Sequence, residues 1–167
     1  MPVEKQAYRE AMARLGAAVN VITTDGPGGR AGFTASAVCS VTDTPPTLLV
    51  CANRTNDSYP ALRANGVLCV NTLTGGQEQI SPVFAGLTDH TMEARFDSGA
   101  WSTLATGAPT LEGAAVAFDC KIDQVVEVGT HDVFFCIVEA VRLGALHEVL
   151  IYYGRGYYRV THSGYSG

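Results

Sequence analysis

The sequence predicts a mainly β protein, an antiparallel barrel with short helices packed on its outside. Six or seven runs of β-branched, aromatic and aliphatic residues are separated by turns. The connections between them are too short for the crossovers that parallel strands require. Residues with helical spacing are confined to a few short segments. A length of 167 residues is that of one domain, so we expect a single barrel.

The N-terminal third predicts a helix followed by a hairpin. Residues 7–15 carry apolar side chains at helical spacing, and the helix is expected to end near Gly16. Residues 19–24 and 31–42 are extended runs joined by a turn of Asp, Gly and Pro, which predicts a β-hairpin. The letters Gly-Pro-Gly-Gly-Arg-Ala at 26–31 match a dinucleotide-binding fingerprint. That site needs a helix to start inside it, and strand-like residues follow here, so we interpret the motif as the hairpin turn.

The next part of the sequence alternates strands with a loop and a short helix. Two prolines at 45–46 end the second run of the hairpin, and residues 47–52 predict a buried strand. The polar residues 53–58 predict a loop that leads into a short helix at 59–63. Residues 67–72 predict the strand that follows.

The C-terminal half predicts short helices and then long strands. Helical spacing over residues 77–96 is interrupted by one Pro and one Gly, which indicates one or two short helices, and residues 101–113 are expected to be irregular. Residues 114–128 and 131–143 predict two long strands joined by a tight turn, and residues 149–153 predict the last strand.

No internal repeat or linker divides the chain. We therefore expect one domain over residues 1–160, followed by a tail at 161–167.

The composition excludes several classes of partner. Charged residues make up 16% of the chain, against about 25% in an average soluble protein, which predicts a subunit interface or a cofactor that covers uncharged surface. The net charge of −5 has the wrong sign for nucleic acid or anionic lipid. No uncharged segment approaches the about 20 apolar residues of a spanning helix, and the first residues lack the order of a signal peptide. We expect a cytoplasmic protein that binds neither nucleic acid nor membrane.

Cysteines and histidines indicate no disulfide and no metal site. The cysteines are odd in number, lie in apolar runs and are never closer than twelve residues, so we interpret them as buried free thiols in a reducing compartment. The histidines are scattered, so the close spacing of metal ligands is missing. These residues are Cys39, Cys51, Cys69, Cys120, Cys136, His90, His131, His147 and His162.

Three segments carry candidate binding residues. Residues 32–37 place small or hydroxylic side chains on one strand, where a flat ligand can approach the backbone, although small residues also fill tight barrel interiors. The loop 53–58 can hold a phosphate through amides and hydroxyls, with Arg54 adding charge and Asp57 opposing it. His131, at a strand start, either contacts a ligand at the barrel mouth or belongs only to the turn.

The sequence contains aromatic candidates but no hydrolytic machinery. Four tyrosines near the C-terminus can form an aromatic wall or ordinary packing, namely Tyr152, Tyr153, Tyr157 and Tyr158. No Ser-His-Asp order, nucleophile elbow, paired carboxylates or zinc-protease motif is found.

Over residues 8–159 the chain resembles the flavin reductase family, the small components of two-component flavin monooxygenases. It is similar there to the reductases of pyrimidine utilisation and of 4-hydroxyphenylacetate hydroxylation. Each motif alone is weak, and their order and spacing together carry the resemblance. The segments are 16–24, 31–51, 69–73, 84–86, 95–96 with Trp101, 129–135 and the tyrosine-rich end.

The resemblance implies an FMN-binding split barrel and a homodimer with flavin bound at the subunit interface. It implies an NAD(P)H-dependent flavin reductase that transfers hydride from nicotinamide to FMN or FAD and supplies the reduced flavin to a separate monooxygenase. Because the cofactors supply the chemistry, no strong general base is required. The choice of flavin, of NADH or NADPH, and of partner oxygenase does not follow from the sequence.

The resemblance also implies roles for particular residues. One strand contacts the flavin ring, a second strand and its loop lie along the ribityl phosphate, two residues close the site, and two lie near flavin and nicotinamide. The residues expected at the ring are Thr34, Ala35, Ser36 and Ala37, and those along the ribityl phosphate are Cys51, Ala52, Asn53 and Ser58. Phe84 and Ala85 are expected to close the site. Tyr157 and His131 are expected near flavin and nicotinamide, with His131 as the catalytic candidate.

Two departures and two alternatives remain. Ala37 stands where many relatives have Ser, and Thr130 stands where Asp is common, so the hydrogen bonding of the flavin and the charge state of His131 stay open. The alternatives are a reductase that passes electrons to another acceptor, such as a cobalt corrinoid, through a tightly held flavin, and a flavin-binding module without catalysis.

Overall fold

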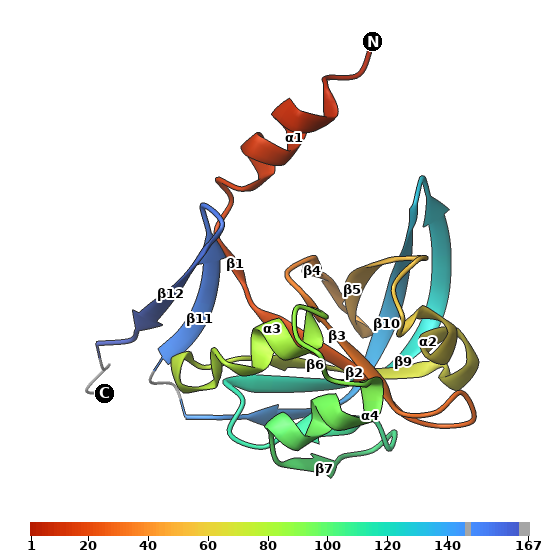
Figure 1. The fold of residues 1–167 in the computed structure, drawn as a ribbon. Coiled ribbons are helices and arrows are strands. Elements are labelled where there is room, and N and C mark those ends of the chain that lie inside the picture. The colour runs from red at the N-terminus through yellow and green to blue at the C-terminus, as the bar shows by residue number, and fades with distance from the viewer. Residues whose placement is uncertain (146–147, 164–167) are drawn as a thin grey trace.

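The structure, a computed structural model, describes residues 1–145 and 148–163. Its helices are short, and many more of the described residues lie in strands than in helices (Figure 1). The helices are α1 (Lys5–Met12), α2 (Tyr59–Asn65), α3 (Ile80–Phe84) and α4 (Met92–Arg95), with the 3₁₀ turns η1 (Gly75–Gln77) and η2 (Phe96–Ser98). The strands are β1 (Ala17–Ala18), β2 (Asn20–Thr24), β3 (Ala31–Ala35), β4 (Val38–Asp43), β5 (Pro46–Asn53), β6 (Val67–Thr72), β7 (Trp101–Thr103), β8 (Pro109–Leu111), β9 (Val116–Val128), β10 (His131–Leu143), β11 (Glu148–Tyr153) and β12 (Gly156–Thr161).

The main sheet has seven antiparallel strands in the order β3-β2-β6-β9-β10-β5-β4. The prediction of a mainly β, antiparallel fold is therefore confirmed. The sheet is not closed into a barrel by hydrogen bonds, because β3 and β4, which are consecutive in the chain, form its two opposite edges. The prediction of a barrel is therefore wrong in so far as it implies a closed sheet. The opening, or split, lies between the edge strands β3 and β4.

The split follows from a change of partner at Ser36 and Ala37. Up to Ala35 the chain pairs with β2, and from Val38 it pairs with β5. Between them the Val38 amide donates to the Ser36 carbonyl oxygen at 2.9 Å, which turns the chain away from its first partner. The extended run expected over residues 31–42 is for this reason two strands in one segment.

The predicted hairpin at the start of the sheet is confirmed. β2 and β3 are paired from Thr24 and Ala31 onward, and the Gly29 amide donates to the Gly26 carbonyl oxygen at 2.9 Å inside the turn. Asn65 of α2 fixes the same turn, because its Oδ1 accepts from the Gly28 amide at 2.6 Å. The glycine-rich motif is thus a turn, and no helix begins in it.

Two smaller sheets complete the fold. β1, β11 and β12 form one, and β7 and β8 form the other, within the segment that was expected to be irregular. The last strand continues to Thr161, the first residue of the expected tail, and residues 164–167 of that tail lie outside the described residues.

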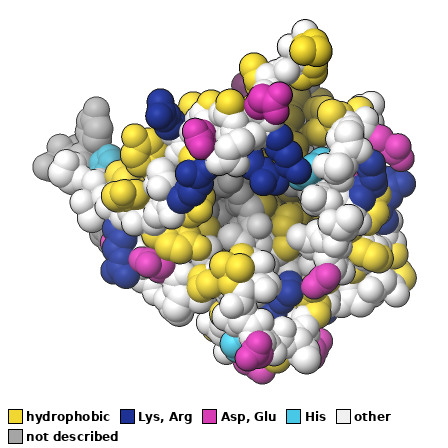
Figure 2. All heavy atoms as spheres, turned by 45° about the horizontal axis from the view of Figure 1, so that its top comes forward, with side chains coloured by type: hydrophobic (Ala, Val, Ile, Leu, Met, Phe, Trp, Pro, Cys, Tyr) yellow, Lys and Arg dark blue, Asp and Glu magenta, His cyan; other side chains and the backbone are white. Residues whose placement is uncertain are grey.

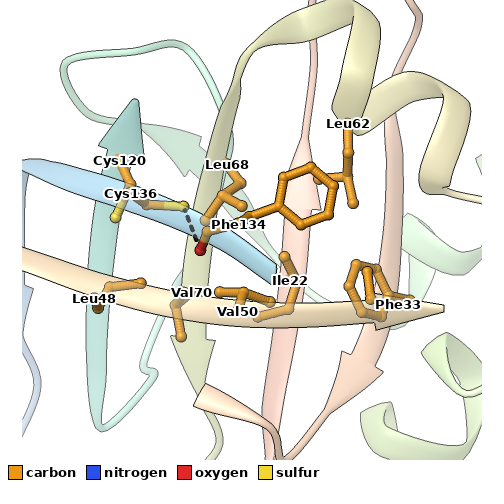
Figure 3. Packing of buried hydrophobic residues seen from close by; sticks show 11 residues of the cluster. Ile22, Phe33, Leu48, Val50, Leu62, Leu68, Val70, Cys120, Phe134 and Cys136 are labelled. Atoms are coloured by element: carbon orange, nitrogen blue, oxygen red, sulfur yellow. Dashed lines mark hydrogen bonds between the residues drawn. The ribbon is translucent and has the colours of Figure 1, made fainter. Parts of the chain in front are cut away.

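A buried cluster fills the inside of the curved main sheet. Figure 3 shows Phe134 of β10 beside Leu62 of α2, with Ile22, Val50 and Val70 from three further strands. Phe134 is completely buried, and burying such a ring contributes about 1.5–3 kcal/mol relative to leaving it in water. A second cluster lies under α3 and η2, so β2 is buried along its whole length.

The thiols of the chain are all free, but they are not all buried. Cys69, Cys120 and Cys136 are buried, Cys51 is partly buried and Cys39 is exposed on β4. The expectation of buried free thiols is therefore wrong for Cys39, because β4 is an edge strand whose outer residues face solvent.

Helix α1 projects away from the rest of the molecule (Figure 1). None of its residues is buried in the chain. Its C-terminal end is attached to the body, where the Gly154 amide donates to the Ala13 carbonyl oxygen at 2.7 Å.

Candidate functional site

A cleft of about 220 Å³ lies between the end of β3, helix α3 and the β11–β12 hairpin. Its lining is mostly small or aromatic: Val19, Thr34, Ala35, Ser36, Ser81, Ala85, Leu87, Tyr152 and Tyr157. A wider pocket of about 670 Å³ adjoins it, shares Ser36 and Tyr152, and carries Arg9 and Arg155. The face shown in Figure 2 is hollowed near its middle, with Lys and Arg side chains around the hollow.

Hydrogen bonds join three elements around the cleft. Thr34 Oγ1 donates to the Ser81 carbonyl oxygen at 2.6 Å, which ties β3 to α3. The hydroxyls of Ser81 and Tyr157 lie 2.7 Å apart, which ties α3 to β12. The rings of Tyr152 and Tyr157 pack with centroids 5.5 Å apart. The walls of the cleft are therefore held in place by polar and aromatic contacts.

The edge position of β3 leaves its backbone free on one side. The amide of Gly32 faces Met92 Sδ and its carbonyl oxygen accepts from Arg95, so both of these groups point away from β2. Because alternate residues of an antiparallel strand point their backbone groups the same way, Thr34 presents its amide and carbonyl along the same edge. The cleft thus has backbone donors and acceptors beside small side chains.

The described lining of the cleft lacks the ionisable side chains that most often serve as general acids or bases. None of the described residues that line it is Asp, Glu, His, Lys or Cys. An arrangement of small side chains, free backbone groups and two tyrosine rings suits a flat ligand with polar edges.

The structure brings five of the predicted site residues together in this cleft, namely Thr34, Ala35, Ser36, Ala85 and Tyr157. Ala37 lines the adjoining wider pocket. Cys51 lies next to it, since its amide donates to the Ala37 carbonyl oxygen at 3.0 Å, and burial raises the pKa of its thiol.

The other predicted residues lie outside the cleft. The side chain of Ala52 is buried in the main cluster, and Asn53 Oδ1 accepts from the amide and the hydroxyl of Thr55, both at 2.9 Å. Ser58 is buried. Phe84 is also buried, with its ring packed against Phe96 and Trp101 at centroid distances of 5.2 and 5.6 Å. Phe84 thus supports the cleft from behind.

His131 lies at the tip of the long β9–β10 hairpin, which projects from the sheet (Figure 1). Its side chain is exposed, its Nδ1 lies 2.9 Å from Thr130 Oγ1, and its backbone is paired with Asn53 of β5. It does not line the cleft of its own chain.

Arg54 holds the turn that carries His131. Its guanidinium donates to the carbonyl oxygens of Gly129 and His131 and, at 2.9 Å, to Asp132 Oδ1. Tyr59 donates to the other oxygen of Asp132 at 2.6 Å. The Tyr59 and Arg54 hydrogen bonds hold the pKa of the Asp132 carboxyl below its usual value. Arg54 is engaged here, so the expected contribution of its charge to a phosphate site has no support in this geometry.

Sequence reasoning missed several residues around the cleft. Val19, Ser81 and Leu87 come from segments that carry no binding motif, and only the fold places them beside β3. Arg9 and Arg155, on the adjoining pocket, are isolated in the sequence. Tyr152 belongs to the tyrosine-rich end that was named as a possible aromatic wall, and it does form one.

Neither a cluster of metal ligands nor a membrane-spanning helix occurs in the part of the chain that the structure describes. Within residues 1–145 and 148–163, no three His, Cys, Asp or Glu side chains lie close enough together to hold a metal ion. His147 lies outside these ranges. No helix in this part of the chain is long and apolar enough to cross a membrane.

Comparison with known proteins identifies the family. Residues 12–161 match the flavin reductase like domain. A relative from Ancylobacter novellus, named FMN reductase (NADH) RutF, is 60% identical over 159 residues, which are 95% of this chain and 87% of the relative. Another from Pantoea ananatis, with the same name, is 61% identical over 93% of this chain and 81% of its own length.

Solved structures agree with these relatives. The NADH:FAD oxidoreductase SgcE6 of Streptomyces globisporus, in complex with NAD and FAD fragments, superposes with a TM-score of 0.86 at 26% identity and covers 98% of both chains. On the match of its sequence to the domain and on the identity of its relatives, this chain belongs to the flavin reductase like family.

Proposed function

We propose that this protein is an NADH-dependent FMN reductase that supplies reduced flavin to a separate monooxygenase. The observation that carries the proposal is the 60% identity to proteins named FMN reductase (NADH) over nearly the whole chain. The cleft supports it independently, because its described lining offers contacts to a flat ring and contains no carboxylate or imidazole.

The cleft fits the flavin ring. Ala35, Ser36 and Ala85 are small enough to let a planar system approach the β3 edge, and Tyr157 forms part of the opposite wall. The free backbone groups of Thr34 can bond the polar edge of such a ring. Ser81 keeps Thr34 and Tyr157 in register through its two hydrogen bonds.

The residues of the chain align and shelter the reactants. When bound, the flavin accepts a hydride from the nicotinamide and supplies the redox chemistry. Tyr152 and Leu87 present apolar surface to the cleft, and the packed pair of Tyr152 and Tyr157 fixes one side of the space in which two rings can stack. Arg9 and Arg155 offer positive charge for the phosphates of a dinucleotide in the adjoining pocket.

We propose further that the protein is a homodimer in which His131 acts near the partner's flavin. In its own chain His131 stands on a projecting tip outside the cleft. Large apolar side chains are exposed near this tip and on the β11–β12 hairpin: Val126, Val128, Tyr153, Tyr158 and Val160. A subunit interface would cover them.

The variant His131→Ala should impair the use of NADH more than the binding of FMN. The expected result is a raised KM for NADH and a lower kcat, with the Kd for FMN changed less than about threefold. Steady-state kinetics and flavin fluorescence titration measure the two. An equal loss of both would show that His131 has a different role.

The proposal includes a single domain and a cytoplasmic location. One domain over residues 1–160 agrees with the 12–161 match. The five free thiols support a cytoplasmic location, where disulfides rarely persist.

The test measures turnover for each pairing of FMN, FAD or riboflavin with NADH or NADPH. The rate is the loss of nicotinamide absorbance over time in air. We expect the highest kcat/KM for FMN with NADH, and reduced flavin free to leave the protein. No turnover above the uncatalysed rate in any combination would refute the reductase. Flavin binding without turnover would instead favour a flavin-binding module without catalysis. If NADH reduces only a flavin that stays bound through purification, the protein would be a reductase that passes electrons to another acceptor.

A further inference from the structure

The tip of the β9–β10 hairpin is not held in place by buried side chains. Residues 126–131 are all exposed, and the first buried residue after them is Asp132. The hairpin projects from the sheet, with His131 at its tip (Figure 1). A segment with so little buried surface gains little stability from packing. The position of the tip therefore depends on hydrogen bonds to a neighbouring segment.

Arg54, in the loop between β5 and α2, donates hydrogen bonds to three consecutive residues of this turn. Its backbone amide donates to the Thr130 carbonyl oxygen at 3.1 Å. Its guanidinium donates to the His131 carbonyl oxygen at 3.1 Å and to the Gly129 carbonyl oxygen. Because the N–H groups of a guanidinium form a rigid planar fork, two oxygens bound by it are held in a fixed relation. Arg54 thus fixes the backbone from which the His131 side chain projects.

Arg54 is itself connected to the core of the molecule. Its Nη1 also donates at 2.9 Å to Asp132 Oδ1, and the Asp132 side chain is 1% exposed. Tyr59 donates to the other oxygen of this carboxylate at 2.6 Å. The Tyr59 ring packs against Phe134 of the main buried cluster, with centroids 6.2 Å apart. We call these contacts of Arg54 with the turn and with Asp132 the Arg54 clamp, and they join the exposed tip to the core.

The Arg54 clamp does not use the imidazole of His131. The bonds that Arg54 donates go to main-chain carbonyl oxygens and to the Asp132 carboxylate. The His131 Nδ1 lies 2.9 Å from Thr130 Oγ1, a residue of the same turn. Arg54 therefore determines where the ring stands and leaves its nitrogens to other partners.

We propose that Arg54 is the positioning residue for His131 in the reaction, and that it holds the turn so that the imidazole reaches the nicotinamide in the partner's cleft. The inference rests on the proposed function and adds the residue through which His131 is placed. A displacement of about 1 Å in a group that aligns reactants can cost up to about a hundredfold in rate. An exposed tip without its clamp can move by that much.

Arg142, at the other end of β10, provides a matched control. Its guanidinium also donates to a main-chain carbonyl oxygen, that of Leu111 at 2.8 Å, and to Ser102 Oγ at 2.9 Å. It also pairs with the Glu112 carboxylate at 3.1 Å. None of these residues lines the cleft. Arg142→Gln therefore removes a similar set of hydrogen bonds without touching the turn of His131.

The experiment is a double-mutant cycle of Arg54→Gln and His131→Ala, read by NADH kinetics and by fluorescence titration of FMN. Arg54→Gln should lower kcat/KM for NADH about tenfold and change the Kd for FMN less than about threefold. Arg142→Gln should keep both within about twofold of the parent protein. Added to His131→Ala, Arg54→Gln should lower kcat/KM by less than a further factor of about two, because the ring that it positions is gone.

Arg54→Lys separates geometry from charge. It keeps a cation beside Asp132 but lacks the planar fork, so it should restore only part of the activity. If Arg54→Gln does not fold, as judged by circular dichroism, Arg54→Lys is taken through the same cycle instead.

Three results would overturn the proposal: unchanged kinetics in the Arg54 variants, an equal loss of FMN binding and NADH use, or the same loss whether or not His131 is present. Amide hydrogen exchange of residues 126–131 tests the clamp without any turnover. It should be faster in Arg54→Gln and unchanged in Arg142→Gln. A parent protein without turnover would refute the reductase, whereas unchanged exchange in Arg54→Gln would refute the clamp even in an active enzyme.

Discussion

At the scale of single residues, the Asp132 carboxylate organises the turn that carries His131. It is almost fully buried and accepts hydrogen bonds from Tyr59 and Arg54. Hydrogen bonding to Asp132 also raises the pKa of the Tyr59 phenol. A buried carboxylate is tolerated here only because two donors surround it.

The stability that Asp132 contributes should therefore depend on pH. Its folded pKa is lowered, so the contribution is present above its unfolded pKa of about 3.9 and is lost as the pH falls through the folded value. At pH 6 we expect Asp132→Asn to unfold at a lower urea concentration than the parent protein. This difference in urea midpoint should narrow below about pH 4.

Asp123→Asn is the control, since Asp123 is an exposed carboxylate on the neighbouring strand β9. It should change the free energy of unfolding by no more than about 0.5 kcal/mol at any pH in the series. A gap for Asp132→Asn that stays constant down to pH 3 would contradict the assignment.

The cleft shows which residues the sequence could and could not predict. Thr34, Ala35 and Ser36 were predicted because small residues on a strand form a local pattern, and the family resemblance gave that pattern a meaning. Ser81 was not, because its place in the cleft comes from its contacts with Thr34 and Tyr157, which two other segments supply. Local patterns are visible in a sequence, whereas burial and convergence exist only in the fold.

At the scale of elements, strands were predicted well and their partners were not. The hairpin β2–β3 and the long strands β9 and β10 follow directly from turn residues and apolar runs. The break at Ser36 was missed, because the residues on both sides of it favour strands equally and only the change of pairing divides them. The β7–β8 hairpin was missed because each of its strands is three residues long.

The turn between β11 and β12 contains a strained residue. Gly154 and Arg155 have φ values of 58° and 65°, which is the geometry of a two-residue hairpin turn with both central residues left-handed. Glycine adopts it freely, whereas arginine does not. Arg155 also reaches the wider pocket, so a strained position carries a side chain that the proposed dinucleotide site would use.

Arg155→Asn should stabilise the protein by about 1 kcal/mol, because asparagine is tolerated at this position of the turn. Urea unfolding measures the change. Arg155→Ala removes the same side chain and keeps the strain, so it should give no comparable gain. Equal stability of the two variants would mean that backbone strain is not what limits this hairpin.

At the scale of the whole molecule, the low content of charge and the projecting helix α1 point to the same explanation. An isolated helix of eight residues is marginal in water, and α1 buries none of its residues in its own chain. Tyr8, Met12 and Leu15 are exposed at its end and along its length. The proposed homodimer would cover them and would account for a chain in which only 16% of the residues are charged.

Removal of residues 1–12 should leave the body of the molecule folded and weaken its dimer. At concentrations where both chains are monomeric, the unfolding free energy of the truncated chain should fall with urea as steeply as that of the full chain. The Kd of the dimer should rise at least about tenfold. Sedimentation velocity over a concentration series measures the Kd. A truncated chain that dimerises as tightly as the full chain would exclude α1 from the interface, and a monomeric full chain would exclude the dimer itself.

The unpaired edge of β3 has a consequence for the behaviour of the protein in cells. Exposed edge strands invite pairing with other chains and so promote aggregation. Around Gly32 this edge is covered by Arg95 and Met92, but beside Thr34 it opens into the cleft. A ligand seated there would mask the remaining backbone groups. The supply of flavin in an expression host should accordingly govern how much of the protein is recovered in soluble form.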